Sequence, residues 1–434
     1  MRETLSSQIV STKLRRIAEQ AIQYPEMVFT TLAHHIDVDF LREAYRLTRK
    51  DAAPGIDRMT AKEYALNLEE NLRNLHSRLK EGRYYAPPVS RVWIPKDDGG
   101  ERPLGLPTFE DKIAQRAVTM LLEAVYEGDF YAFSHGFRRG HSQHQALKEL
   151  RQRCMEGNIE WIVDADVKGY FDNIEHDKLL EVIRLRINDG GILRLIGKWL
   201  NAGVMEGETL TYSDKGTQQG GVASPMLANI FLHHVLDKWY VEGVIPAIKG
   251  ETFLIRFADD FLLGCENESD AQWVMTALTE RLQQYGLTIH PTKTRLVKFG
   301  KPRDKGSCGN GSFDFLGFTH YWAKSRRGYW VIKRETAKKR LRRTFKRIWE
   351  WCRKTRHEPL IEQHRALCLK LKGHYQYYGI RCNYRKLSLV YRQVWKAWKY
   401  WLSRRSHKGA ISWESLSKLE QLFPFPKPQI IHDI

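Results

Sequence analysis

The sequence contains few cysteines and no long hydrophobic run, and each absence excludes a class of protein. The six cysteines are scattered through 434 residues without a C-x-x-C pair, so neither a disulfide framework nor a zinc knuckle is expected. No stretch of 18 apolar residues occurs, and we therefore expect no transmembrane helix. The first residues also lack the apolar segment of a secretory signal, which favours a cytoplasmic protein.

Acidic residues are scarce in one segment, residues 324–408. This segment holds 27 Lys and Arg against four Asp and Glu, although the whole chain has a formal net charge of only +19. Fourteen aromatic residues are interleaved with these charges. A basic, aromatic-rich segment of this kind is typical of proteins that bind a nucleic-acid backbone. The alternative, a solvated helical face, usually brings compensating acids.

Two adjacent aspartates, Asp259 and Asp260, lie between two apolar runs within residues 253–264. The runs predict two short buried strands with the acids at the turn between them. Like charges side by side at the end of an apolar hairpin repel each other and resist desolvation. A hard divalent cation relieves both problems, and oxygen ligands suit Mg²⁺. Because Asp is also a common turn residue, an ordinary turn remains the alternative for this pair alone.

A second acidic segment covers residues 161–173, where the pattern predicts a strand, a turn and then a helix. Asp164 and Asp166 share one face of this strand, and Asp172 lies past the turn. Two-metal phosphoryl transfer needs carboxylates from separate elements to converge, and the chain offers two such elements. Capping or turn formation remains an alternative for Asp164 and Asp172.

Other local patterns predict the elements around these acids. Residues 96–100 form a strong hairpin-turn signal between two extended stretches, so Lys96 and Arg102 can project toward one ligand. Apolar spacing predicts helices over most of residues 1–50, over 225–239 and over 336–355. We also predict a short strand over residues 313–318.

Taken in order, these segments resemble the reverse transcriptases (maturases) that bacterial group II introns encode, over roughly residues 12–432. The matching segments are 53–57, 94–107, 134–138, 166–172, 216–225, 257–260, 315–318 and 371–379. The resemblance implies an α+β right-hand polymerase fold with fingers, an antiparallel palm sheet and a helical thumb. We expect an N-terminal helical extension at 1–50, fingers and palm at 51–320, a basic thumb or maturase domain at 321–407 and a C-terminal tail at 408–434.

The same resemblance implies an RNA-directed DNA polymerase that adds dNTPs to a primer 3′-hydroxyl with two Mg²⁺ ions, for which Mn²⁺ can substitute. The implied metal ligands are the carboxylates of Asp166, Asp259 and Asp260 and the carbonyl of Val167. The implied dNTP contacts are Lys96, Arg102, Phe171, Gln219 and Lys293, and the implied template or primer contacts are Gly220, Gly221, Phe257, Leu316 and Gly317. Phe171 is expected to exclude a 2′-hydroxyl, and Lys293 to protonate or neutralise the pyrophosphate.

The implied partners are an RNA template, a DNA or RNA primer, the RNA–DNA duplex and a host intron RNA. They would meet a cytoplasmic bacterial protein, monomeric or homodimeric, without the Cys pairs of the endonuclease domain found in many relatives. Three positions depart from the family pattern: Phe257 stands where Tyr is common, and Gln218 and Arg139 stand where Pro is common. They leave open a domesticated polymerase acting in DNA repair or phage defence. A further alternative is a non-catalytic RNA-binding splicing factor, which would not need three clustered acids.

Overall fold

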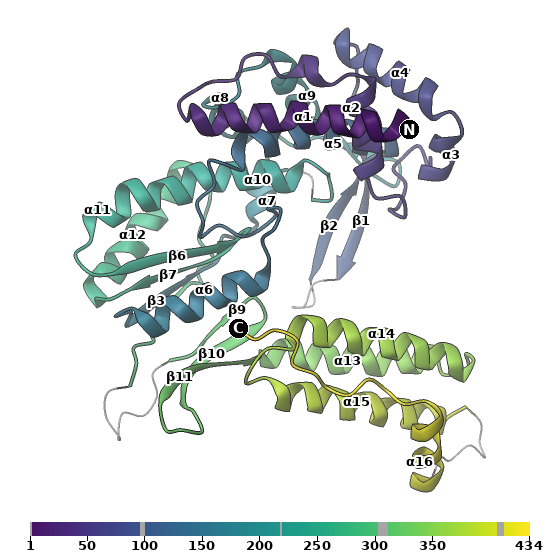
Figure 1. Ribbon diagram of the computed structural model, residues 1–434, viewed down its shortest axis with the longest axis vertical. Helices are drawn as coiled ribbons and strands as arrows, with labels where there is room; N and C mark the ends of the chain where they lie inside the picture. Colours follow the sequence, from purple (N-terminus) through teal and green to yellow (C-terminus); the bar gives the residue numbers. More distant parts are fainter. Residues whose placement is uncertain (1, 96–99, 218, 303–310, 406–411) are drawn as a thin grey trace.

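The computed structural model describes residues 2–95, 100–217, 219–302, 311–405 and 412–434, and it is a mixture of helices and antiparallel-rich sheets (Figure 1). The predicted α+β class is confirmed. Three sheets occur in this described part, with strand orders β6-β7-β3-β8, β2-β1-β4-β5 and β11-β10-β9. No helix within these ranges is both long and apolar enough to cross a membrane.

The central sheet consists of β6 (Thr252–Phe257), β7 (Asp260–Cys265), β3 (Trp161–Ala165) and β8 (Arg295–Lys298), all paired antiparallel. Its apolar runs are explained by burial on both faces, because successive strand residues point to opposite sides. The pair Leu254 and Leu263 packs with helix α12 (Glu268–Gln284), whereas Ile255 and Leu262 pack with helix α6 (Gln143–Glu156). The two strands predicted around the acidic pair are therefore confirmed.

The N-terminal region surrounds α5 (Phe109–Tyr126), which is buried along nearly its whole length. Helices α1 (Arg2–Gln23), α2 (Val38–Leu47) and α3 (Ala61–Leu66) pack against it. The same hydrophobic core includes residues of α4 (Leu68–Lys80), α7 (Tyr170–Asn173), α8 (His176–Arg184) and α9 (Gly190–Leu200). The prediction of helix over residues 1–50 is right for α1 and α2. It is wrong for residues 24–37, which contain only the short 3-10 helix Ala33–His35.

The second sheet contains the predicted hairpin. β1 (Val89–Pro95) pairs antiparallel with β2 (Glu101–Leu106), and β4 (Val204–Glu206) and β5 (Thr209–Thr211) extend the sheet beyond β1. The register places Ile94 opposite Arg102 and Arg91 opposite Gly105. Because side chains alternate along a strand, Arg102 and Arg91 lie on opposite faces of the hairpin. Lys96 lies outside the described residues.

The helix predicted over residues 225–239 begins as α10 (Ser224–Leu232) but continues as π-helix over His233–Lys238 and Tyr240–Val244 before α11 (Ile245–Ala247). Pro225 stands in the first turn of α10, where its missing N–H costs no hydrogen bond. The wider π turns change the direction of the following side chains, among them Asp237, which is completely buried.

The C-terminal region combines the third sheet with a bundle of three long helices. The strands are β9 (Phe313–Phe315), β10 (Phe318–Lys324) and β11 (Trp330–Thr336), and the helices are α13 (Lys338–Lys354), α14 (Leu360–Tyr378) and α15 (Tyr384–Leu402). The predicted helix over 336–355 is confirmed. The single strand predicted over 313–318 is wrong, because Leu316 and Gly317 both have positive φ, 47° and 80°, and turn the chain back between β9 and β10.

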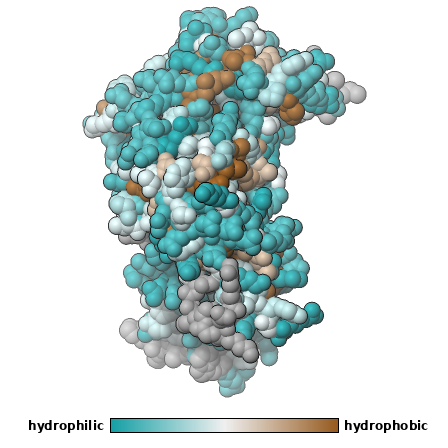
Figure 2. Space-filling view, turned by 90° about the vertical axis from the view of Figure 1, so that its left-hand side faces the viewer, coloured by the Kyte–Doolittle hydropathy of each residue, from teal (hydrophilic) through white to brown (hydrophobic). Residues whose placement is uncertain are grey.

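The end of the chain packs along this C-terminal bundle (Figure 1). After α16 (Trp413–Leu422), Phe425 is buried in the bundle core and the Tyr375 hydroxyl donates to the Pro426 carbonyl at 3.1 Å. Figure 2 shows one side of the molecule as mainly hydrophilic, with hydrophobic residues gathered in small patches. Small patches of this size are ordinary for a protein surface and indicate no broad apolar face on that side.

Candidate active site

The two adjacent aspartates lie at the hairpin between β6 and β7. Phe257 pairs with Asp260, so the connection consists of Ala258 and Asp259 alone. Ala258 takes a positive φ of 58°, which a non-glycine residue adopts only when its surroundings hold it there. The tight connection brings both carboxyl groups to one end of the central sheet.

Asp166 emerges at the same end of the sheet. Ala165, the last residue of β3, pairs with Phe261 of β7, which places Asp166 beside the Asp259–Asp260 hairpin. The Lys293 Nζ lies 3.1 Å from an Asp166 carboxylate oxygen, and the Asp166 carbonyl accepts from the His290 backbone N–H at 2.7 Å. Asp164 instead forms an ion pair with Arg295 at 2.9 Å. Two of the predicted residues, Asp166 and Lys293, are therefore already in contact.

The pKa values of these acids are raised by burial first and by their mutual repulsion second. Desolvation in the concave site, followed by the charges of Asp259 and Asp166, raises the pKa of Asp260 to about 6, although its side chain reaches solvent. Desolvation also raises the pKa of Asp259, with Asp166 adding to the shift and Arg102 opposing it. A bound cation would remove this repulsion, because it favours the charged form of every carboxylate near it.

The acids do not form a finished metal cage. Across the described ranges, no three His, Cys, Asp or Glu side chains lie close enough together to hold an ion. Mg²⁺ typically takes only one or two carboxylates and fills its remaining positions with water and substrate phosphates. The carboxylates and the carbonyl of the buried Val167 are all oxygen donors and fit that pattern.

A cleft of about 540 Å³ lies between the Asp259–Asp260 hairpin and the C-terminal bundle, and Asp166 is not among the residues that line it. On one side it is lined by Asp259, Asp260 and Phe257, and on the other by Arg340, Arg343 and Arg347 of α13. The predicted residues Leu316 and Gly317 also line it, together with Phe137, Gln143, Ala258, Thr344, Tyr377 and Tyr378. Carboxylates that can hold cations thus face arginines that can hold phosphates.

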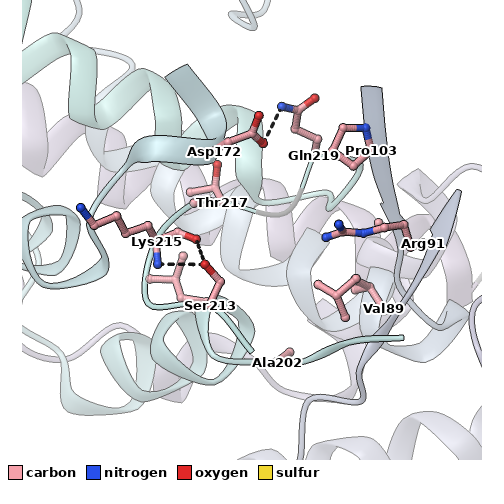
Figure 3. A pocket seen from close by; sticks show the side chains of 13 residues that line it. Val89, Arg91, Pro103, Asp172, Ala202, Ser213, Lys215, Thr217 and Gln219 are labelled. Atoms are coloured by element: carbon pink, nitrogen blue, oxygen red, sulfur yellow. Dashed lines mark hydrogen bonds between the residues drawn. The ribbon is translucent and has the colours of Figure 1, made fainter. Parts of the chain in front are cut away.

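A second, smaller pocket of about 240 Å³ lies beside the β1–β2 hairpin, on the face that carries Arg91 (Figure 3). At its rim the Gln219 side-chain amide donates to Asp172 at 2.9 Å. The Gln219 carbonyl accepts from the Gly105 N–H at 2.6 Å. Gln219 is therefore held between α7 and β2. Its hydrogen bond to Asp172 was not expected from the sequence.

Glycine is required where this loop meets β2. A Cβ on Gly220 would lie 2.5 Å from the Gly105 carbonyl oxygen, and Gly220 has φ of 111°. The following Gly221 is buried.

Phe171 is half-buried, with its ring packed edge-to-face against Tyr170 at 5.3 Å. Gln218, one of the three departures from the family pattern, lies outside the described residues.

The reverse transcriptase (RNA-dependent DNA polymerase) family profile matches residues 94–320, which include the three acids and the hairpin strand β2. This chain belongs to that family. Within it, the chain is 39% identical over 234 residues to the group II intron-encoded protein LtrA of Lactococcus lactis subsp. cremoris, covering 53% of this chain and 38% of LtrA. It is 31% identical over 289 residues to protein YkfC of Escherichia coli K12, covering 59% of this chain and 75% of YkfC.

A shorter match, 29% identical over 90 residues, joins this chain to nuclear intron maturase 1 of Arabidopsis thaliana mitochondria, covering 21% of this chain and 12% of that protein. These relatives support a reverse transcriptase of the group II intron and maturase type. The chain spans well under half the length of LtrA.

Two of the positions that depart from the family pattern lie in the described residues. Arg139 forms an ion pair with Glu123 at 2.9 Å, and Phe257 lines the acidic cleft.

Several residues beside the acids of this reverse transcriptase have neighbours that the sequence did not indicate. Asp172 was expected either as an acid of the second acidic segment or as a capping or turn residue, and its bond from the Gln219 amide, 47 residues away in the chain, was not foreseen. Arg340, Arg343 and Arg347 line the acidic cleft, whereas in the sequence they stand among many other basic residues. Their spacing of three and four residues, which puts them on one helix face, was the available signal.

Proposed function

We propose that this chain is an RNA-directed DNA polymerase of the group II intron type, adding dNTPs to a primer 3′-hydroxyl on an RNA template. One observation carries the proposal: the end of the central sheet that bears Asp259 and Asp260, with Asp166 beside them, shares a cleft with the arginines of α13. Phosphoryl transfer needs cations at the reacting phosphate, and a duplex substrate needs positive charge along its backbone. The cleft offers carboxylates that can hold the cations and arginines that can contact the duplex backbone.

In this proposal, Asp166 and Asp259 hold two Mg²⁺ ions, with Mn²⁺ as a substitute, and Asp260 and the Val167 carbonyl support them. The ions supply activation of the primer hydroxyl and stabilisation of the leaving pyrophosphate when bound. Lys293, whose Nζ lies 3.1 Å from Asp166, balances the charge of that carboxylate and neutralises the pyrophosphate. Phe171 excludes a 2′-hydroxyl, while Gln219, Gly220 and Gly221 lie along the nucleotide and template.

The regions then correspond to a right hand. The N-terminal extension covers residues 1–50, the fingers and palm cover 51–320, the helical thumb covers 321–407 and the tail covers 408–434. The β1–β2 hairpin is the fingertip, the central sheet is the palm, and α13 lies along the duplex with Leu316 and Gly317 at the primer end. The partners are an RNA template, a DNA or RNA primer and the RNA–DNA duplex.

A primer-extension assay tests this function. The purified chain, supplied with a primed RNA template, dNTPs and Mg²⁺, is expected to extend the primer. Removal of divalent cations with a chelator should abolish extension, and Mg²⁺ or Mn²⁺ should restore it, because the carboxylates alone cannot stabilise the reacting phosphate. Absence of extension by a folded, duplex-binding protein would contradict the proposal.

Replacing Arg102 tests the nucleotide site. Arg102 lies on the hairpin face opposite to Arg91, and its positive charge acts on Asp259. We expect Arg102→Glu to raise the KM for dNTP by about 10- to 100-fold, since a charge-assisted contact to phosphate contributes about 1.5–3 kcal/mol. The control is Arg73→Glu, which changes an exposed arginine of α4 that lines neither pocket and should leave this KM within about threefold. Equal KM values for wild type and Arg102→Glu, measured by steady-state kinetics, would refute the role.

A maturase function, in which the protein also binds its host intron RNA, is the second candidate. Basic side chains of α13 occupy two faces: Arg340, Arg343 and Arg347 line the cleft, whereas Lys339, Arg342 and Lys346 are exposed elsewhere on the helix. This second face leaves positive surface for a structured RNA while a duplex fills the cleft. An intron RNA with a catalytic hairpin domain beside the gene would support this function, and its absence would favour a role in repair or phage defence.

A further inference from the structure

Arg256 is a completely buried arginine three residues before Asp259. It lies in β6, and its side chain has no exposed surface. A buried guanidinium is unfavourable unless charges and acceptors surround it. Here Asp237, also completely buried, accepts two hydrogen bonds from it, at 2.7 Å from Nε and 2.6 Å from Nη2. The remaining nitrogen, Nη1, does not bond to Asp237 and donates to other acceptors.

That nitrogen reaches the turn that carries the acids. Nη1 donates to the side-chain oxygen of Asn229 at 2.8 Å and to the Ala258 carbonyl at 3.1 Å. The Ala258 carbonyl belongs to the peptide group that joins Ala258 to Asp259. Because a peptide group is planar, fixing this oxygen fixes the plane from which the Asp259 side chain departs.

The same network holds the turn from its other side. The Asn229 amide donates to the Gly136 carbonyl at 2.6 Å, and a Cβ on Gly136 would lie 2.1 Å from the Ala258 nitrogen. The backbone of Arg256 is also bonded to that neighbouring segment, donating to Phe133 at 2.9 Å and accepting from His135 at 2.8 Å. The positive φ of Ala258 is therefore confined between the guanidinium and the Gly136 segment.

We propose that Arg256 is a positioning residue for nucleotide addition: held by Asp237 and Asn229, it fixes the Ala258–Asp259 peptide and so the direction in which Asp259 meets the metal ion. This inference rests on the proposed polymerase function. A role limited to folding would require only the ion pair with Asp237 that joins β6 to the π-helical segment. A positioning role also requires the bonds from Nη1, which a lysine cannot reproduce together with that pair.

The test compares two buried arginines by the same conservative change. Arg256→Lys keeps the charge beside Asp237 and loses the fork that reaches Ala258. We expect its kcat to fall by about 10- to 100-fold, because small misplacements of reacting groups have effects of this size. The Mg²⁺ concentration for half-maximal rate should rise severalfold, whereas the KM for dNTP and the affinity for duplex should stay within about threefold.

The matched control is Arg334→Lys. Arg334 is 2% exposed in β11, donates to the Leu147 carbonyl at 3.1 Å and lies in the C-terminal sheet rather than beside the acids. It should leave the Mg²⁺ requirement unchanged. If Arg256→Lys does not fold, Asn229→Ala, which leaves the Arg256–Asp237 pair intact, should raise the Mg²⁺ requirement in the same direction.

A binding measurement separates this inference from the polymerase function itself. Mn²⁺ retained by the protein with template, dideoxy-terminated primer and dNTP, followed by electron paramagnetic resonance, should be bound more weakly by Arg256→Lys than by wild type. Wild-type protein that extends primers, with an Arg256→Lys variant equal to Arg334→Lys in kcat, Mg²⁺ requirement and Mn²⁺ affinity, would overturn the inference alone. Wild-type protein without extension would overturn the proposed function instead.

Discussion

Asp259→Asn is expected to lower primer extension by at least about 10³-fold, equivalent to about 4 kcal/mol of lost transition-state stabilisation. Asp259 lies at the β6–β7 turn and lines the acidic cleft together with Asp260, and the charge of Asp166 acts on it. Without the Asp259 carboxylate, Asp260 and Asp166 would have to hold the cations. The amide preserves the size of the side chain and removes its charge. Affinity for a primed RNA template, measured by fluorescence anisotropy, should stay within about threefold, because the arginines that line the cleft are untouched.

The matched control for this change is Asp164→Asn. Asp164 lies two residues before Asp166 on the same segment, but its carboxylate pairs with Arg295 at 2.9 Å. The pair is partly buried, with the Asp164 side chain 21% and the Arg295 side chain 49% exposed. Loss of such a pair costs about 1 kcal/mol of stability, so this variant should keep most of its activity. Asp259→Asn protein that extends primers at the wild-type rate, or Asp164→Asn protein that loses as much, would rule out the assigned metal ligands.

Replacing Arg340, Arg343 and Arg347 together with Gln should weaken duplex binding by about 10²-fold at moderate salt, if each contact contributes about 1 kcal/mol. These residues line the acidic cleft from α13. Each lost phosphate contact should also reduce the slope of log K against log salt by nearly one, so the triple variant should lose about two to three. The measurement is duplex affinity across a series of salt concentrations.

The chain offers a control with the same charge change on the same helix. Lys339, Arg342 and Lys346 are exposed on a different face of α13 and do not line the cleft. Their triple Gln variant should retain duplex affinity and most of the salt slope. Equal losses in the two triple variants would mean that binding follows net charge rather than a phosphate track along the cleft.

Much of the central sheet could be predicted because its signals are local. The apolar runs on either side of Asp259 and Asp260 are strands buried on both faces, and the turn between them has room for two residues. The helix α13 was equally clear from its apolar spacing. The prediction of one strand over residues 313–318 failed, because Leu316 takes a positive φ, which is uncommon for leucine and cannot be read from its residue type.

The π-helical turns after α10 were missed for a related reason. The apolar pattern of residues 225–239 is compatible with a regular helix, and the wider turns follow from what the helix packs against, including the bond between Asp237 and Arg256. Likewise, the partnership of Gln219 with Asp172 joins residues 47 positions apart, and no local pattern specifies it.

The amino-acid sequence by itself determined the α+β class, the apolar strands with acids at their ends, the basic C-terminal segment and the membership in a reverse transcriptase family. Tertiary structure alone decided which acids lie at one end of the central sheet, which arginines of α13 share a cleft with them and how a buried Arg256 supports the β6–β7 turn. The physical reason is the separation along the chain over which each kind of interaction acts. Periodicity and turn chemistry act between neighbouring residues, whereas charge clusters and buried hydrogen bonds form between elements that only packing brings together.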